Sequence, residues 1–210
     1  MLFDYEGIRV LHRINPRMKH AYLQVEHDGT VVLKSNGKNK QALRAFILSK
    51  REWIAKQQSR LLSHPSITLG QDILYLGESL PLDEVKTHTF RTGSLETMRR
   101  SYDRFYREQA ERHLQEKTDF FAGRLGVGYA QVRFRKMKRR WGSCSKTGII
   151  TYNTLLMQLP EAMIDYTVVH ELAHRVHFNH SADFHALVAS IVPEEKALRA
   201  RMRYLKAVAY

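Results

Sequence analysis

The chain has 210 residues, 43% hydrophobic and 26% charged, a composition typical of a folded globular protein and unlike that of a disordered one. Its 34 Lys and Arg against 21 Asp and Glu give a net charge of +13, which favours acidic partners such as nucleic acids but also fits a solvated basic surface. The single cysteine excludes an internal disulfide, and no signal-peptide-like or membrane-spanning apolar stretch is present, so we expect a cytoplasmic protein without a membrane segment.

The first third of the chain predicts strands followed by a helix. Residues 8–14 and 21–26 partly alternate between apolar and polar side chains and, with 30–33, suggest a small antiparallel meander. Apolar residues then recur at helical spacing over 40–62. Residues 72–82 resemble two short strands that meet at a glycine. We therefore expect a β-rich N-terminal lobe with one long helix over residues 1–90.

The rest of the chain predicts a second region of mixed structure. A long charged helix over 95–125 is followed by strands at about 130–137 and 149–153, separated by a loop. Pro160 precedes a helix from 161 to about 177, and Ser181 can cap a last helix. The expected fold class is α+β, with residues 91–210 forming a second domain, or with the whole chain forming one integrated domain.

The segment 168–186, VVHELAHRVHFNHSADFHA, carries the clearest chemical signal in the chain. On a helix, His170 and His174 lie one turn apart on the same side, the spacing at which two imidazoles reach one metal ion. The neighbouring Glu171 can reach a metal-activated water without binding the metal. HExxH therefore supplies two ligands and a general base.

The third ligand is expected to be His180, which a chain reversal after the second histidine would bring to the open side of the ion. His185, Glu194 and Glu195 are the alternatives. This nitrogen-rich ligand set favours one Zn²⁺ per chain over Mg²⁺ or Mn²⁺. Asp165, Asp183 and Asn153 are candidates for orienting a ligand imidazole through its second nitrogen.

The basic segment 133–140, RFRKMKRR, lies immediately before the loop WGSCS. Its positive charges can form a rim that binds phosphates or acidic side chains, or they can simply keep an exposed strand soluble. The candidate substrate or phosphate ligands are Arg135, Lys136, Arg139, Arg140 and Asn153. Trp141 is expected to anchor the loop, and Cys144 to fill a small core or loop position.

From residue 135 to 193 the chain resembles the YgjP-like (DUF45) family of metal-dependent hydrolases, through WGSCS, I-x-Y-N, HELAH and NHSxxF. That family is related to the M48, WLM and SprT-like zinc peptidases. The resemblance implies a zincin-like fold, with a small mixed or antiparallel sheet packed on the HExxH helix. It also implies that His170, His174 and His180 bind the metal and that Glu171 is catalytic. His185 departs from the family, where this position is commonly aromatic.

Three functions follow from these residues. The first is a zinc metallopeptidase, whose peptide substrate would pair with an edge strand, for which 149–153 is the candidate. The second is a metal-dependent nucleoside triphosphate (UTP) pyrophosphatase that uses the basic residues. The third is a nucleic-acid-binding or DNA-associated protein-processing protein; a purely structural metal is disfavoured because it would need no Glu171. The sequence leaves the oligomeric state open.

Overall fold

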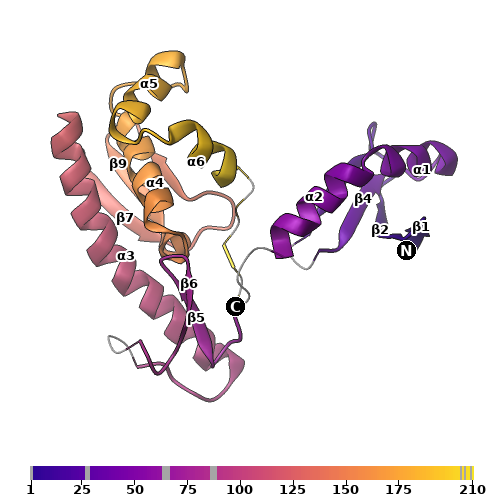
Figure 1. The fold of residues 1–210 in the computed structure, drawn as a ribbon, viewed down its shortest axis with the longest axis horizontal. Coiled ribbons are helices and arrows are strands. Elements are labelled where there is room, and N and C mark those ends of the chain that lie inside the picture. The colour runs from indigo at the N-terminus through magenta and orange to yellow at the C-terminus, as the bar shows by residue number, and fades with distance from the viewer. Residues whose placement is uncertain are drawn as a thin grey trace. The chain divides into compact units, whose positions relative to one another are not determined.

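The computed structural model describes residues 2–26, 29–62, 67–85, 89–203, 205, 207, 208 and 210. The chain divides into two compact units, Met1–Pro65 and Ser66–Tyr210, and each has its own hydrophobic cluster (Figure 1). We expected a boundary near residue 90. The structure instead places the hairpin of β5 (Asp72–Tyr75) and β6 (Glu78–Pro81) in the second unit, where the Leu76 amide donates to the carbonyl of Met157 at 2.8 Å.

The N-terminal unit is a four-stranded sheet with two helices. The strands are β1 (Leu2–Tyr5), β2 (Ile8–Ile14), β3 (Tyr22–Val25) and β4 (Val31–Ser35), in the order β1-β2-β4-β3. Because β2 and β4 are parallel, the expected antiparallel meander is wrong. Strand β4 lies between β2 and β3, and its consecutive residues Val31, Val32 and Leu33 are all buried, as is typical of an internal strand with a parallel partner.

The helices of this unit cover one face of its sheet. The expected single helix is divided at Lys50 into α1 (Lys40–Ser49) and α2 (Arg51–Leu62). Leu43 and Ile47 from α1 and Ile54 from α2 pack against the apolar residues of β2 and β4. The expected β-rich lobe is therefore a complete layer of sheet under a layer of helix.

The second unit is built around a long helix and a three-stranded sheet. Helix α3 (Leu95–Leu125) begins after the capping hydroxyl of Ser94 and ends at Gly126, which adopts the left-handed conformation. The strands β7 (Gln131–Arg135), β8 (Gly142–Cys144) and β9 (Ile149–Asn153) pair in the order β7-β9-β8, with β7 parallel and β8 antiparallel to β9. The sheet is thus mixed.

This order changes the interpretation of the sheet edges. Strand β9 is paired on both sides, so it cannot be the edge strand that we expected to receive a substrate. The edge strand that packs against helix α4 (Glu161–Ala173) is β8, which was not predicted because three residues show no alternation.

Helix α4 lies in the core of the second unit and follows the short 3-10 helix η1 (Thr154–Gln158). Its apolar residues Ile164, Val168 and Leu172 form one fully buried row. The helix ends at Ala173, with His174 as its C-cap, although the pattern predicted an end near His177. Helices α5 (Ala182–Ile191) and α6 (Glu195–Met202) complete the unit. Within the described ranges no helix is both long and apolar enough to cross a membrane.

Candidate metal centre

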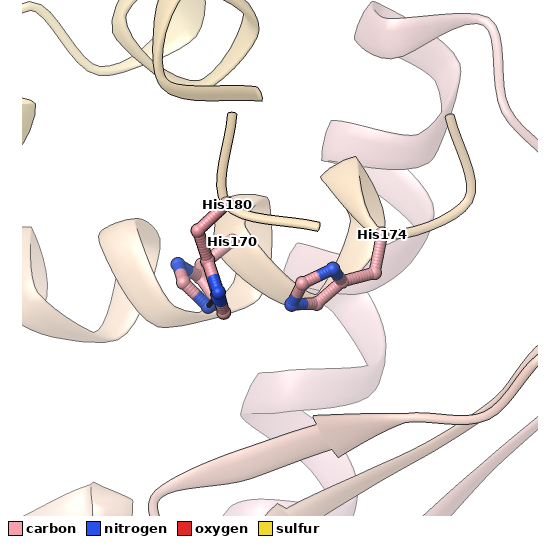
Figure 2. Close-up of side chains that lie close together, drawn as sticks. All are labelled: His170, His174 and His180. Atoms are coloured by element: carbon pink, nitrogen blue, oxygen red, sulfur yellow. Dashed lines mark hydrogen bonds between the residues drawn. The ribbon is translucent and has the colours of Figure 1, made fainter. Parts of the chain in front are cut away.

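Three histidine side chains converge where α4 ends. One ligand atom of each of His170, His174 and His180 lies within 4.8 Å of the other two. His170 and His174 come from the last turn of α4, and His180 comes from the segment that folds back before α5 (Figure 2). The Nε2 atoms of His170 and His180 are 3.1 Å apart. The early end of α4 is what allows the chain to return and bring His180 to the other two rings.

Hydrogen bonds at the second ring nitrogens fix which atoms face the cluster. Nδ1 of His174 donates to the carbonyl oxygen of His177 at 3.1 Å, which leaves Nε2 as an acceptor. Nδ1 of His170 lies 3.4 Å from the Tyr166 hydroxyl, which accepts its proton when Nε2 is the ligand atom. Both arrangements suit metal binding through Nε2.

The residues that orient the imidazoles are not those expected. Asp165 pairs with Lys117 at 2.5 Å, and Asp183 is exposed in the first turn of α5. The side chain placed to orient the His170 imidazole is that of Tyr166. Its position four residues before His170, on the same side of the helix, is a sequence signal that could have identified it.

Phe184 forms an apolar wall behind the cluster. Its ring is fully buried, and its centroid lies 4.9, 4.7 and 4.8 Å from the ring centroids of His170, His174 and His180. The Ser181 hydroxyl caps α5 and thereby fixes the first turn that carries this phenylalanine. A rigid wall limits the rotamers of all three imidazoles, which keeps their nitrogens together.

Burial keeps the histidines neutral. The pKa of His170 is lowered to about 3, mainly because the ring is desolvated and also because His174 and His180 are close. Burial also lowers the pKa of His174. A metal ion binds the neutral imidazole, so these side chains are ready to bind a divalent metal without first losing a proton.

Glu171 lies beside the cluster and does not belong to it. Its side chain is only 5% exposed, and burial raises its pKa to about 8, although the charge of Arg140 acts in the opposite direction. A carboxylate with a raised pKa, held next to a metal-binding cluster, has the affinity for protons that a general base requires.

Gly142 of β8 is the closest neighbour of this carboxylate. A Cβ atom added at Gly142 would lie 2.5 Å from Oε1 and 2.7 Å from Cγ of Glu171, closer than atoms can approach. Only glycine therefore permits the observed position of Glu171. The sequence gives no sign of this contact, because no local pattern connects residues 142 and 171.

The alternative ligands lie outside the cluster. Nδ1 of His185 is 2.9 Å from the buried carboxylate of Glu195, and its Nε2 is 2.5 Å from the guanidinium of Arg199. Glu194 is exposed at the start of α6. Among the described residues, the only histidines and acids that meet as a ligand set are the three imidazoles.

The expected substrate-binding residues are dispersed. Lys136 pairs with Asp103 at 2.6 Å and lies over the ring of Tyr210. Asn153 is 2% exposed and binds the backbone of the preceding loop: its amide donates to the carbonyls of Met137 and Arg140 and accepts from the amide of Met137. Asn153 is thus positioned to hold the loop and is not open to a substrate.

The basic residues that remain are exposed. Arg135, Arg139 and Arg140 have exposed side chains, and among them Arg140 is the one whose charge acts on Glu171. Trp141 is half-buried against the core of the second unit, as expected for a loop anchor, and Cys144 is half-buried in β8.

Comparisons with known proteins identify the family of this chain. The family described as YgjP-like, metallopeptidase domain, matches residues 19–205. No curated protein matches. Among solved structures, the metallopeptidase zymogen abylysin of Pyrococcus abyssi is 28% identical, with 46% of this chain and 99% of abylysin covered and a TM-score of 0.40. The zymogen jannalysin of Methanocaldococcus jannaschii is 19% identical, with 44% and 97% covered and a TM-score of 0.38. The chain belongs to the YgjP-like metallopeptidase family and is a metal-dependent hydrolase.

Proposed function

We propose that the protein is a zinc metallopeptidase in which His170, His174 and His180 hold the metal and Glu171 is the general base. The observation that carries this proposal is the convergence of three imidazoles beside a buried carboxylate that does not belong to their cluster. Zinc–nitrogen bonds of about 2.0–2.1 Å in a tetrahedron place two nitrogens about 3.3 Å apart. The 3.1 Å between the Nε2 atoms of His170 and His180 fits that separation.

The residues divide the chemistry between them. When bound, zinc makes a water molecule more acidic and polarises the scissile carbonyl. Glu171 accepts the proton from the attacking water and delivers it to the amine that leaves. The apolar wall of Phe184 and the burial of Glu171 exclude bulk water, which strengthens each electrostatic interaction in the site.

Strand β8 is the proposed binding edge for the peptide. It is paired with β9 on one side only, and it packs against α4, the helix that carries Glu171. An extended substrate that adds to this edge would pass directly by Glu171, because Gly142 lies against that carboxylate. Arg140, just before the strand, is a candidate contact for a substrate carboxylate.

The nucleotide alternative receives less support from the same residues. Lys136 and Asn153, two of the five expected phosphate ligands, have partners within the protein. Arg135, Arg139 and Arg140 remain candidates, but a triad of nitrogen ligands suits zinc better than the magnesium that nucleotides usually require.

The test is the substitution Glu171→Gln. We expect it to retain one zinc per chain and to lower peptide hydrolysis by about 10²–10⁴-fold, because the amide cannot accept the proton. His180→Ala should lose zinc, and Glu194→Gln, an exposed position outside the cluster, should behave like the parent protein.

The same preparations should be assayed with unstructured peptides and with UTP. Full peptidase activity in Glu171→Gln contradicts the role of the base. Release of pyrophosphate without peptide cleavage replaces the peptidase proposal with the nucleotide one.

A further inference from the structure

The excess positive charge of the chain is concentrated in the N-terminal unit. Met1–Pro65 contains 12 Lys and Arg residues against 5 Asp and Glu residues, a net of +7 out of the +13 of the whole chain. The stretch 29–51 alone contains six basic residues and no acidic one. None of these charges belongs to the metal centre, which lies in the other unit. The hydrolytic site therefore does not account for most of the charge.

One face of the N-terminal sheet is free of helices. Val10, Val31 and Leu33 point to the face that α1 and α2 cover. The residues that alternate with them point to the opposite face, where Arg13 of β2, Lys34 of β4 and Tyr22 of β3 lie side by side in register. We call this set, together with Arg9, the open-face row. The same face holds the fully buried Val32 and, opposite Arg9, the carboxylate of Asp4.

The open-face row combines cations with an accessible aromatic ring. Tyr22 is 58% exposed, Arg9 and Arg13 are exposed, and Lys34 is half-buried. Arg17 and Lys19, both exposed, follow in the connection between β2 and β3 and extend the basic surface. An exposed tyrosine beside basic side chains on a sheet is an arrangement on which bases can stack while phosphates are neutralised.

Both sides of the unit carry ion pairs at the surface. On the helical side, Glu6 binds both Arg44 and Arg51, at 2.9 and 3.7 Å. On the open side, Lys34 donates to the neutral side-chain amide of Gln24 at 3.3 Å, and Arg13 makes an exposed pair with Glu26 at 3.2 Å. An exposed pair of this kind contributes little stability and can exchange for a phosphate.

We propose that the open face of the N-terminal sheet binds single-stranded nucleic acid, with Tyr22 stacking on a base and Arg9, Arg13 and Lys34 contacting phosphates. A single strand is favoured over a duplex because only unpaired bases offer their faces to Tyr22. This surface is distinct from the basic segment 133–140, and its use does not depend on the peptidase proposal.

The experiment measures binding of fluorescently labelled oligothymidine and oligouridine of about 12 nucleotides to the full chain by anisotropy. Tyr22→Ala should weaken binding about tenfold and leave its salt dependence unchanged, because stacking carries no charge. The pair Arg13→Ala and Lys34→Ala should lower the slope of log K against log salt by about 1.4, since each phosphate contact on a single strand contributes about 0.7.

The matched control is the pair Arg44→Ala and Arg51→Ala, which removes the same charge from the helical side and should bind nearly as well as the parent protein. Zinc content and the unfolding temperature verify that each variant is folded. The proposal is overturned if both double variants lose affinity equally, if Tyr22→Ala binds normally, or if a duplex or an acidic peptide binds as tightly as the single strand.

Discussion

At the scale of single residues, the site depends on neighbours that are distant in the sequence. Glu171 is held against a glycine from another strand, and the three imidazoles share one aromatic wall. The HExxH motif supplies the proposed base and two of the proposed metal ligands. Their exact placement comes from Gly142, Tyr166 and Phe184, none of which is a metal ligand.

Gly142→Ala is expected to reduce activity without loss of zinc. The added Cβ would lie 2.5 Å from Oε1 of Glu171, so the carboxylate must move by an ångström or so, a displacement that typically costs about 10² in kcat. Gly123→Ala adds the same methyl where nothing lies within 4 Å and should keep full activity. Zinc content and peptide hydrolysis measure the two effects; equal activity in both variants would contradict the contact.

Tyr166→Phe is expected to weaken zinc binding by about tenfold, because the Nδ1 proton of His170 loses its acceptor. Removal of a partner that orients a ligand histidine typically lowers metal affinity by about 10–100-fold. We expect the lower value here because the hydrogen bond is long, at 3.4 Å. Competition with a chromogenic chelator measures the affinity directly. Tyr129→Phe, which removes a hydroxyl bonded to Gln115 outside the site, is the control and should leave the affinity unchanged.

At the scale of elements, the loop between β7 and β9 connects stability to function. Asn153, at the end of β9, fixes this loop through backbone groups of Met137 and Arg140. The loop leads into β8 and so determines where Gly142 meets Glu171. We expected the side-chain amide of Asn153 to be a candidate phosphate ligand. It is buried and instead holds the backbone of the loop.

Asn153→Ala is expected to lower the free energy of unfolding by about 3 kcal/mol, because several buried backbone groups lose their partners. Urea unfolding measures this loss. Gln131→Ala, at the exposed start of β7, should change stability by less than about 0.5 kcal/mol. A similar small change for Asn153→Ala would show that water replaces the amide and that the loop is not held in this way.

At the scale of the whole molecule, the two units have separate cores. Among the described residues, none belongs to both hydrophobic clusters, and the three clustered histidines lie in Ser66–Tyr210. Bound metal should therefore stabilise one unit and leave the other unaffected, since a ligand stabilises only the structure that binds it.

Calorimetry should show two unfolding transitions, and EDTA should lower the temperature of only one. At a free zinc concentration about 1,000 times Kd, zinc contributes about 4 kcal/mol to the unit that binds it. His180→Ala should reproduce the effect of EDTA without the chelator. A single transition that shifts as a whole would contradict independent unfolding of the units.

The sequence by itself determined much of this protein. The rows of apolar residues predicted the buried helix, and the spacing of His170 and His174 predicted that their side chains lie on the same side of it. These inferences succeed because helical periodicity is a local property. The family resemblance rests on the same short motifs, and the match over residues 19–205 confirmed it.

Only the tertiary structure decided the rest. The parallel pairing of β2 with β4, the central position of β9, the role of Asn153 and the contact between Gly142 and Glu171 all join residues far apart in the chain. No periodicity encodes such contacts, because they depend on how several elements compete to bury their apolar faces at once. The sequence thus identifies the reacting groups, whereas the packing determines where they lie.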